Sequence, residues 1–208
     1  MVKILEKVER RLGEKLFIKG DRCLGPKCVT VRRAYPPGVH GKRRTRRREG
    51  TGYGLLLAEK QKLRFLYGLD DREIARYSNK ASTKKGIYAS NILQMLEARF
   101  DNIVFRLGLA DSRRSGRQLI THGHVLVNGK VVHIPSYTVR KGDVISLKER
   151  ILKSPLYAHF NERIKKYEPP QWLILDKVKK TGTLKDAPYA DDWGLTIDVA
   201  KIKEFYSR

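Results

Sequence analysis

Six of the seven residues from Lys42 to Arg48 are basic, and they form the densest run of charge in the chain. Arginine suits phosphate oxygens because its planar guanidinium group can donate two parallel hydrogen bonds. Such a run carries no code for particular bases, so it predicts affinity for a phosphate backbone without choice of sequence. A solvated basic loop is the alternative that the run alone leaves open. The six residues are Lys42, Arg43, Arg44, Arg46, Arg47 and Arg48.

A second group of polar side chains is expected at the start of one helix. Ser112 is a typical N-cap, and residues 113–121 suit the helix behind it. A helix N-terminus attracts phosphate because its free N–H groups and its dipole are positive there. The Asn-Gly turn at residues 128–129 predicts a β-hairpin directly after the helix. A generic small α+β domain is the alternative, and the surface side chains that we expect are Arg113, Arg114, Arg117, Gln118, His122 and Lys130.

Cys23 and Cys28 flank a Gly-Pro turn and have the residue type of half a zinc site. Such a site needs two more ligands, the chain has no other cysteine, and the nearest histidine is His40. We therefore expect two reduced thiols in a turn, with no metal and no other cofactor. The sequence also lacks a Walker loop, a Gly-x-Ser-x-Gly motif and a His-Glu-x-x-His motif, so we do not expect an enzyme.

The chain carries 45 Lys and Arg against 22 Asp and Glu, a net charge of +23. An excess of this size repels itself unless an anionic partner neutralises it. An anionic membrane is disfavoured because no run approaches the roughly 20 apolar residues of a membrane span, and no secretory or lipidation signal is visible. The expected partner is therefore nucleic acid, met mainly by the first 150 residues, with no membrane and no small-molecule substrate.

The spacing of apolar residues predicts an α+β fold with separate helical and β-rich parts. Residues 17–54 are basic and glycine-rich, show no clear period, and are expected to take shape against RNA. Trp172–Leu175 is expected to be a strand and Asp176–Gly194 a turn-rich segment. The two expected β pairs cover residues 124–132 and residues 136–147. Helices are expected over residues 3–16, 58–67, 71–86, 90–107, 113–121, 155–168 and 197–206.

Several longer motifs resemble one known family, that of the fourth protein of the bacterial small ribosomal subunit. The resemblance runs from about residue 10 to the end of the chain, with the motifs in the family's order. They are Ala34–Gly41, Glu59–Arg64, Asp101–Gly108, Ser112–Gln118, His122–Gly129, Ile134–Tyr137 and Glu204–Arg208.

The resemblance implies three parts. Residues 1–54 would be a basic extension, residues 55–95 with 169–208 a helical domain, and residues 96–168 an inserted alpha-L RNA-binding domain of two helices and a small β-sheet. Direct contacts to ribosomal RNA would be made by Tyr35, His40, Lys60, Lys62, Arg64, Arg106, Arg113, Arg114, Arg117, Gln118, His122 and Lys130. We also expect Arg113 and Arg117 to be replaceable without loss of stability.

The function implied is that of a structural constituent of the small ribosomal subunit. Family members bind the 5′ region of the subunit's rRNA early and nucleate assembly. They line the mRNA entrance with the third and fifth proteins of the subunit, which would place residues 42–48 beside mRNA. Contact with the fifth protein links them to translational fidelity. A cytoplasmic ribosome is expected, an organellar one stays open, and so does repression of the protein's own mRNA.

The chain departs from part of the family at a possible zinc site. Some members have a second cysteine pair upstream, where this chain has Glu6 and Glu9.

Two rival classes also share the alpha-L module. Pseudouridine synthases carry a catalytic domain after the module, but the roughly 40 residues that follow the expected module here are too few for such a domain. Arg99-Phe100-Asp101 faintly resembles their catalytic motif, but it lies before the hairpin. Stress-related RNA binders are shorter and lack the Pro-Pro-Gly-x-His-Gly stretch.

Overall fold

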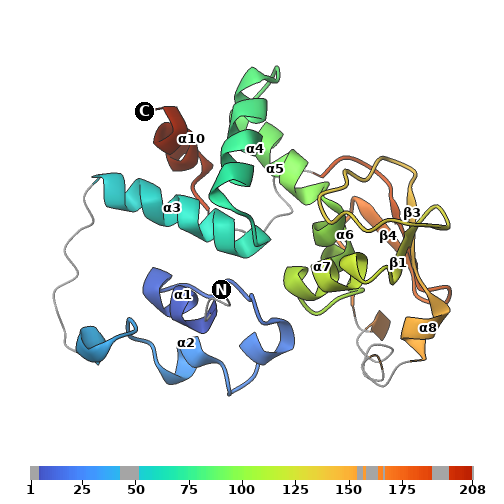
Figure 1. The fold of residues 1–208 in the computed structure, drawn as a ribbon, viewed down its shortest axis with the longest axis horizontal. Helices are drawn as coiled ribbons and strands as arrows, with labels where there is room; N and C mark the ends of the chain where they lie inside the picture. Colours follow the sequence, from blue (N-terminus) through green and yellow to red (C-terminus); the bar gives the residue numbers. More distant parts are fainter. Residues whose placement is uncertain are drawn as a thin grey trace. The chain divides into compact units, whose positions relative to one another are not determined.

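A computed structural model describes residues 5–42, 52–153, 157, 164–165, 167–188 and 197–207. The fold is α+β, as expected, and the chain divides into two compact units (Figure 1). Unit 1 is formed by residues 1–83 and 195–208, and unit 2 by residues 84–194.

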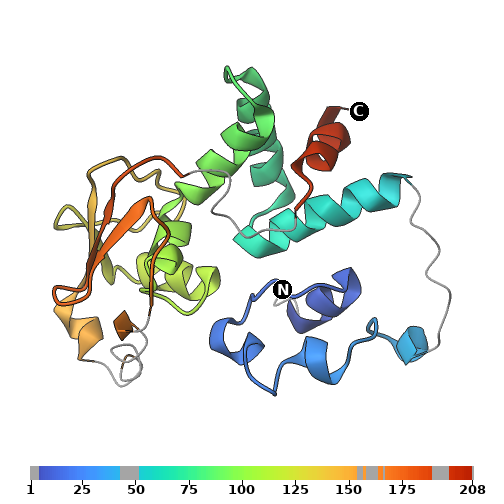
Figure 2. The same cartoon turned by 180° about the vertical axis from the view of Figure 1, so that it is seen from behind.

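Unit 1 is helical. Its α10 packs against α3 and also touches α4, so this C-terminal helix closes the unit (Figures 1 and 2). The rings of Tyr53 and Phe205 are 5.8 Å apart across the pair formed by α3 and α10. Leu63, Ile74 and Ile202 are almost fully buried between these helices. The elements are α1 (Leu5–Leu12), η1 (Gly20–Cys23), α2 (Val29–Arg32), η2 (Val39–Lys42), α3 (Gly52–Tyr67), α4 (Asp71–Thr83) and α10 (Val199–Ser207).

Unit 2 combines helices with an antiparallel sheet whose strand order is β2-β1-β3-β5-β4. One face of the sheet packs on α6 and α7, with Phe100, Ile103 and Ile120 fully buried (Figure 1). Its helices are α5 (Tyr88–Glu97), α6 (Phe100–Arg106), α7 (Arg113–Thr121) and α8 (Glu149–Leu152). Its strands are β1 (Val125–Val127), β2 (Lys130–Val131), β3 (Val144–Leu147), β4 (Leu173–Asp176) and β5 (Thr181–Leu184).

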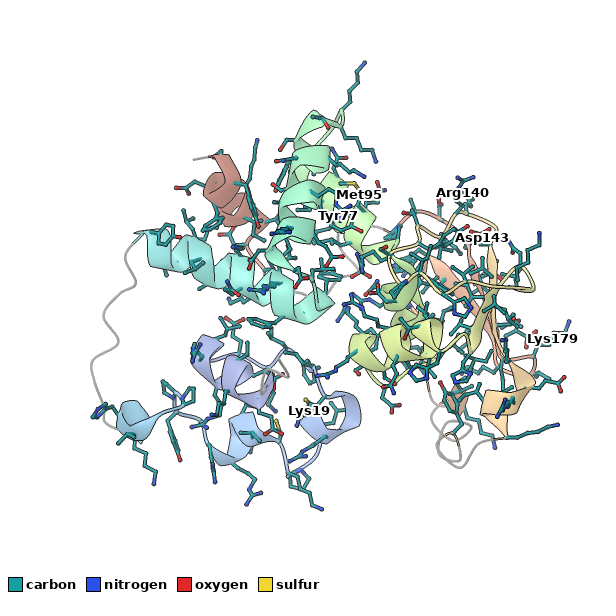
Figure 3. The ribbon with its side chains drawn as sticks, viewed as in Figure 1. Lys19, Tyr77, Met95, Arg140, Asp143 and Lys179 are labelled. Atoms are coloured by element: carbon teal, nitrogen blue, oxygen red, sulfur yellow. The ribbon has the colours of Figure 1, made fainter. Side chains whose placement is uncertain are left out.

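The predicted hairpin is confirmed. Asn128 and Gly129 have φ of 50° and 77°, the pair of positive values that a type I′ turn requires. The Asn128 side chain donates to Asp143 Oδ1 at 2.8 Å and accepts from the backbone N–H of Val144 at 2.9 Å. Asp143 also accepts from the backbone N–H of Arg140 at 2.8 Å, and Figure 3 labels both residues. Asp143 therefore ties the hairpin turn to the turn before β3.

The expected helix over residues 90–107 is divided in two. Arg99 leaves the helix with extended backbone, φ −67° and ψ 140°. The chain there pairs with the segment around Thr138: the N–H of Phe100 donates to the Tyr137 carbonyl at 2.9 Å, and the N–H of Val139 donates to the Ala98 carbonyl at 3.1 Å. Hydrogen bonds to a distant segment thus replace those that a continuous helix would have made.

The second expected β pair is wrong. Residues 136–140 make only an isolated bridge, between Thr138 and Arg99, while β3 pairs with β1 and β5. Strand β5 lies in the segment that was expected to be turn-rich. Its Gly182 lies against Leu107, and a side chain at position 182 would collide with that leucine, so glycine is required there. The same glycine interrupts the run of β-favouring residues by which a strand is recognised in the sequence.

The units also differ from the expected domain boundaries. Strands β4 and β5 were assigned to the helical part with residues 169–208, but they extend the sheet of unit 2. Helix α5, assigned to the helical part as well, packs on α6 in unit 2. Residues 17–42, expected to be irregular, contain the short helical segments η1, α2 and η2.

Candidate nucleic-acid interface

Two carboxylates are buried where α5 gives way to α6. Glu97 has no exposed surface and Asp101 is 2% exposed. A buried carboxylate is costly unless cations and hydrogen-bond donors surround it. Both acids have such partners, and the partners are arginines from α6, α7 and the α5–α6 junction.

Asp101 lies between two guanidinium groups. Arg99 donates to both of its carboxylate oxygens, from Nε at 3.1 Å and from Nη2 at 2.9 Å. Arg117, on α7, donates to Oδ2 from Nη2 at 2.7 Å and from Nε at 3.1 Å. Asp101 therefore joins α7 to the start of α6.

Glu97 holds a second pair of arginines. Arg106 donates to it through two parallel hydrogen bonds, at 2.9 and 3.1 Å. Arg113 lies 3.8 Å from Glu97 and donates from Nε to the side chain of Asn102 at 2.7 Å. Asn102 in turn donates to Glu97 at 2.8 Å. The Arg113 guanidinium also lies 4.8 Å from the centre of the Phe105 ring, a cation–π distance.

Four guanidinium groups thus surround two carboxylates, which leaves an excess of positive charge in a rigid setting. We call these six residues the charge cluster: Glu97, Arg99, Asp101, Arg106, Arg113 and Arg117. The expectation that Arg113 and Arg117 are freely exposed is wrong, since the side chain of Arg113 is only 12% exposed and that of Arg117 33%. The sequence held a signal, because two acids four residues apart border the apolar stripe of the expected helix.

The outer face of α7 carries the polar side chains that remain exposed. Ser112 caps the helix, with its Oγ accepting from the N–H of Ser115 at 3.2 Å. Arg114, Gln118 and Thr121 follow at spacings of four and three residues, so they share one face, and all three are exposed. Gly116, on the opposite side, lies against the Asp101 carbonyl at a distance that a larger residue would crowd. Close packing therefore fixes the direction of the exposed face.

Two histidines extend this face toward the sheet. His122 is exposed and its ring stacks on that of His124, with centres 6.0 Å apart. Burial, reinforced by His122 and by the cations Lys148 and Arg150, holds the pKa of His124 below its usual value. Lys130 is exposed at the hairpin. Arg114, Gln118, His122 and Lys130 are therefore all exposed side chains of unit 2, on α7, just after it and at the hairpin, and their contact with RNA stays a prediction.

In unit 1, Arg10 organises the segment that contains Tyr35. Its Nε donates to the carbonyls of Tyr35 at 2.9 Å and Arg33 at 3.1 Å, and its guanidinium lies 4.7 Å from the centre of the Tyr35 ring. Lys42 approaches the same ring at 5.9 Å. His40 is exposed close by in sequence. Of the basic run, only Lys42 lies within the described residues.

The three basic side chains predicted on α3 are engaged inside unit 1. Lys62 is nearly buried and binds Glu14 and Glu59, each at 2.7 Å. Lys60 and Arg64 both bind Asp71, each at 2.8 Å. These contacts hold α3 to its neighbours, and a contact of these side chains with RNA stays a prediction.

The carboxylates at the possible zinc site are used for other contacts. Glu9, 3% exposed, accepts from the backbone N–H groups of Leu16 and Ile18, and Glu6 binds Lys19 at 2.8 Å. Among the residues that the structure describes, no three Cys, His, Asp or Glu side chains gather as metal ligands would.

Both cysteines are buried and free. Burial raises the pKa of the Cys23 thiol, while a hydrogen bond with Thr30, 2.9 Å away, lowers the pKa of Cys28. That these two cysteines hold no metal stays a prediction.

Comparison with known proteins gives two family matches that together cover most of the chain. Residues 5–97 match the Ribosomal protein S4/S9 N-terminal domain, and residues 98–145 match the S4 domain. The small ribosomal subunit protein uS4 of Thermus thermophilus is 45% identical over 199 residues, which are 96% of this chain and 94% of that protein. The uS4 proteins of Syntrophomonas wolfei and Desulfitobacterium hafniense are 44% and 46% identical over the same shares.

This chain belongs to the uS4 family. Membership makes it a ribosomal protein of the small subunit and confirms the family resemblance read from the sequence. The two family matches meet between Glu97 and Ala98, so the charge cluster joins residues from both. No helix in the described part of the chain has the length and apolar character needed to cross a membrane.

The charge cluster predicts very different effects on stability for neighbouring arginines of α7. Replacing Arg113 and Arg117 together by Glu should lower the free energy of unfolding by about 3 kcal/mol or more, because each change faces a buried carboxylate with a new negative charge. Arg117 should contribute the smaller share, since water screens its exposed third. Replacing Arg114 by Glu should change the free energy of unfolding by no more than about 0.5 kcal/mol.

Urea unfolding followed by circular dichroism measures both variants. Equal stability of the Arg113/Arg117 variant and the parent would show that the cluster does not hold α7. The Arg114→Glu variant is the matched control, since it reverses the same kind of charge on the same helix at an exposed position.

Proposed function

We propose that this chain binds small-subunit rRNA directly, through the exposed face of α7 and the hairpin beside it. The observation that carries the proposal is the pairing of Arg114, Gln118, His122 and Lys130 at the surface with the charge cluster beneath. The surface offers donors for phosphates and 2′-hydroxyls, which are the groups by which folded RNA is recognised. The excess charge of the cluster adds attraction that needs no movement of side chains.

The arginines of the cluster take a second role in this proposal. Arg106, Arg113 and Arg117 keep part of their surface exposed, but their donors are largely committed to Glu97 and Asp101. They therefore position α7 and raise the local potential more than they grip the RNA. Direct contacts fall mainly to the exposed residues, and Tyr35, His40, Lys60, Lys62 and Arg64 are proposed as further contacts in unit 1.

The remaining proposals follow from the family. We infer that the chain binds the 5′ region of the rRNA as a primary binding protein and thereby nucleates subunit assembly. It would line the mRNA entrance with the third and fifth proteins of the subunit and contribute to fidelity through the fifth. The relatives are named as ribosomal proteins, so we propose no enzymatic activity. The site of action is the ribosome, taken to be cytoplasmic.

Binding to a transcript of the rRNA 5′ region should weaken steeply with salt. Each phosphate neutralised by Lys or Arg releases counterions, which gives a slope of about −0.7 to −0.9 in log K against log salt. With about six such contacts, affinity should fall roughly a thousandfold between 50 and 200 mM salt. Titration calorimetry over a salt series measures the slope, and an affinity that is flat in salt would rule out a phosphate-dominated interface.

The 42–48 run is proposed to act on mRNA more than on folding. Replacing Arg43, Arg44, Arg46 and Arg47 by Ala should leave subunit assembly intact but slow elongation through a stable mRNA hairpin, because the cations that hold the incoming strand are lost. The matched control replaces the same four residues by Lys, which keeps the charge and should keep most of the rate. Normal passage of the Ala variant through the hairpin would contradict this role.

A further inference from the structure

Phe17 has an unusual backbone conformation. Its φ is 53°, in the left-handed region that bulky side chains rarely enter. Asn128, another non-glycine residue with positive φ, sits in a turn that requires it, and asparagine tolerates it. A phenylalanine gains nothing of this kind from its own side chain. Backbone strain of this type is maintained only where the surroundings enforce it, and it often marks a functional position.

A buried carboxylate enforces the strain at Phe17. Glu9 Oε1 accepts from the backbone N–H of Leu16 at 3.1 Å and from that of Ile18 at 3.3 Å. These two residues lie on either side of Phe17, so one oxygen atom fixes both ends of the strained unit. The N–H of Gly20 donates to the Phe17 carbonyl at 3.2 Å and closes the turn. Specific hydrogen bonds therefore hold the loop in this conformation.

The strained conformation leaves Phe17 about half exposed to solvent. Phe17 is 47% exposed, whereas Leu16 before it is 7% exposed and part of the core. Burial of an apolar side chain does not require a strained backbone, so burial alone does not explain this conformation. The arrangement instead keeps a flat apolar surface available outside the protein.

The surroundings of the ring are basic. Lys15 and Lys19 stand two residues before and two residues after it, and both are exposed. Lys19, labelled in Figure 3, binds Glu6, but Lys15 forms no salt bridge with any residue that the structure describes. A polyanion therefore suits this surface better than an acidic or neutral protein.

We propose that Phe17 is a stacking platform for an unpaired base of the rRNA, with Lys15 contacting an adjacent phosphate. Unpaired bases are commonly recognised by stacking on aromatic side chains, and cations along the backbone complete such sites. This proposal rests on the proposed function, because it assigns a further contact with the same RNA. It also gives Glu9 a role, as the residue that positions the ring.

The test measures binding of the full chain to a transcript of the rRNA 5′ region over a salt series. Phe17→Ala should weaken binding by about 5- to 150-fold, the range that corresponds to loss of one stacked base. Phe17→Leu, which keeps apolar bulk but loses the flat ring, should weaken it nearly as much, and Phe17→Tyr should bind like the parent. The salt slope should not change in any of these variants, since stacking releases no counterions. Lys15→Ala should instead reduce the slope by about one unit.

Phe17→Gly separates binding from folding. Glycine adopts positive φ without strain, so this variant should melt at the same temperature as the parent or higher, yet bind RNA as weakly as Phe17→Ala. Such a combination cannot arise from a ring that merely supports the fold.

Three results would overturn the inference. They are unchanged RNA affinity for Phe17→Ala and Phe17→Leu, equal affinities for the Leu and Tyr variants, or normal RNA binding with poor incorporation into subunits, which would assign the ring to a neighbouring protein. In each case the parent still binds the transcript and the proposed function stands. Failure of the parent itself to bind would overturn the proposed function.

Discussion

The buried pairing of Glu97 and Asp101 with four arginines is the constraint on which unit 2 depends. These carboxylates lie at a break between helices, where α5 ends and α6 begins, and they hold α7 against both. Burying either acid without its cationic partners would be costly, and the arginines would repel one another without the acids. The result is a set of cations fixed in place before any RNA arrives. Preorganised charge of this kind avoids the entropy that flexible surface lysines lose on binding.

Unit 1 uses a related arrangement on a smaller scale. Arg10 donates to backbone carbonyls and lies over the Tyr35 ring, and Glu9 accepts from backbone N–H groups. Lys62 forms ion pairs with two carboxylates. Each interaction fixes a segment that has too few apolar residues to form its own core. Charged side chains thus replace hydrophobic burial as the means of ordering the basic N-terminal region. This division explains how a chain with a net charge of +23 keeps a defined backbone over residues 5–42.

Local signals in the sequence predicted local structure well. Ser112 as an N-cap and Asn128-Gly129 as a turn are each determined by the geometry of a few residues, and both were confirmed. Strand β5 was missed because Gly182 is selected by contact with Leu107, 75 positions away, and not by its neighbours in sequence. The half-burial of Arg113 and Arg117 was missed for a similar reason. Apolar periodicity locates a core, but it does not show which surface cations have acidic partners beneath them.

Unit 1 is closed by α10, which is formed by some of the last residues of the chain, whereas all of unit 2 lies in one continuous stretch from residue 84 to residue 194. Synthesis proceeds from the N-terminus, so every strand and helix of unit 2 has been made before α10 exists. Domains generally fold as units during synthesis. The exposed face of α7 can therefore form while α3 still lacks the helix that packs against it. The order of translation therefore allows unit 2 to fold first and unit 1 to be completed afterwards.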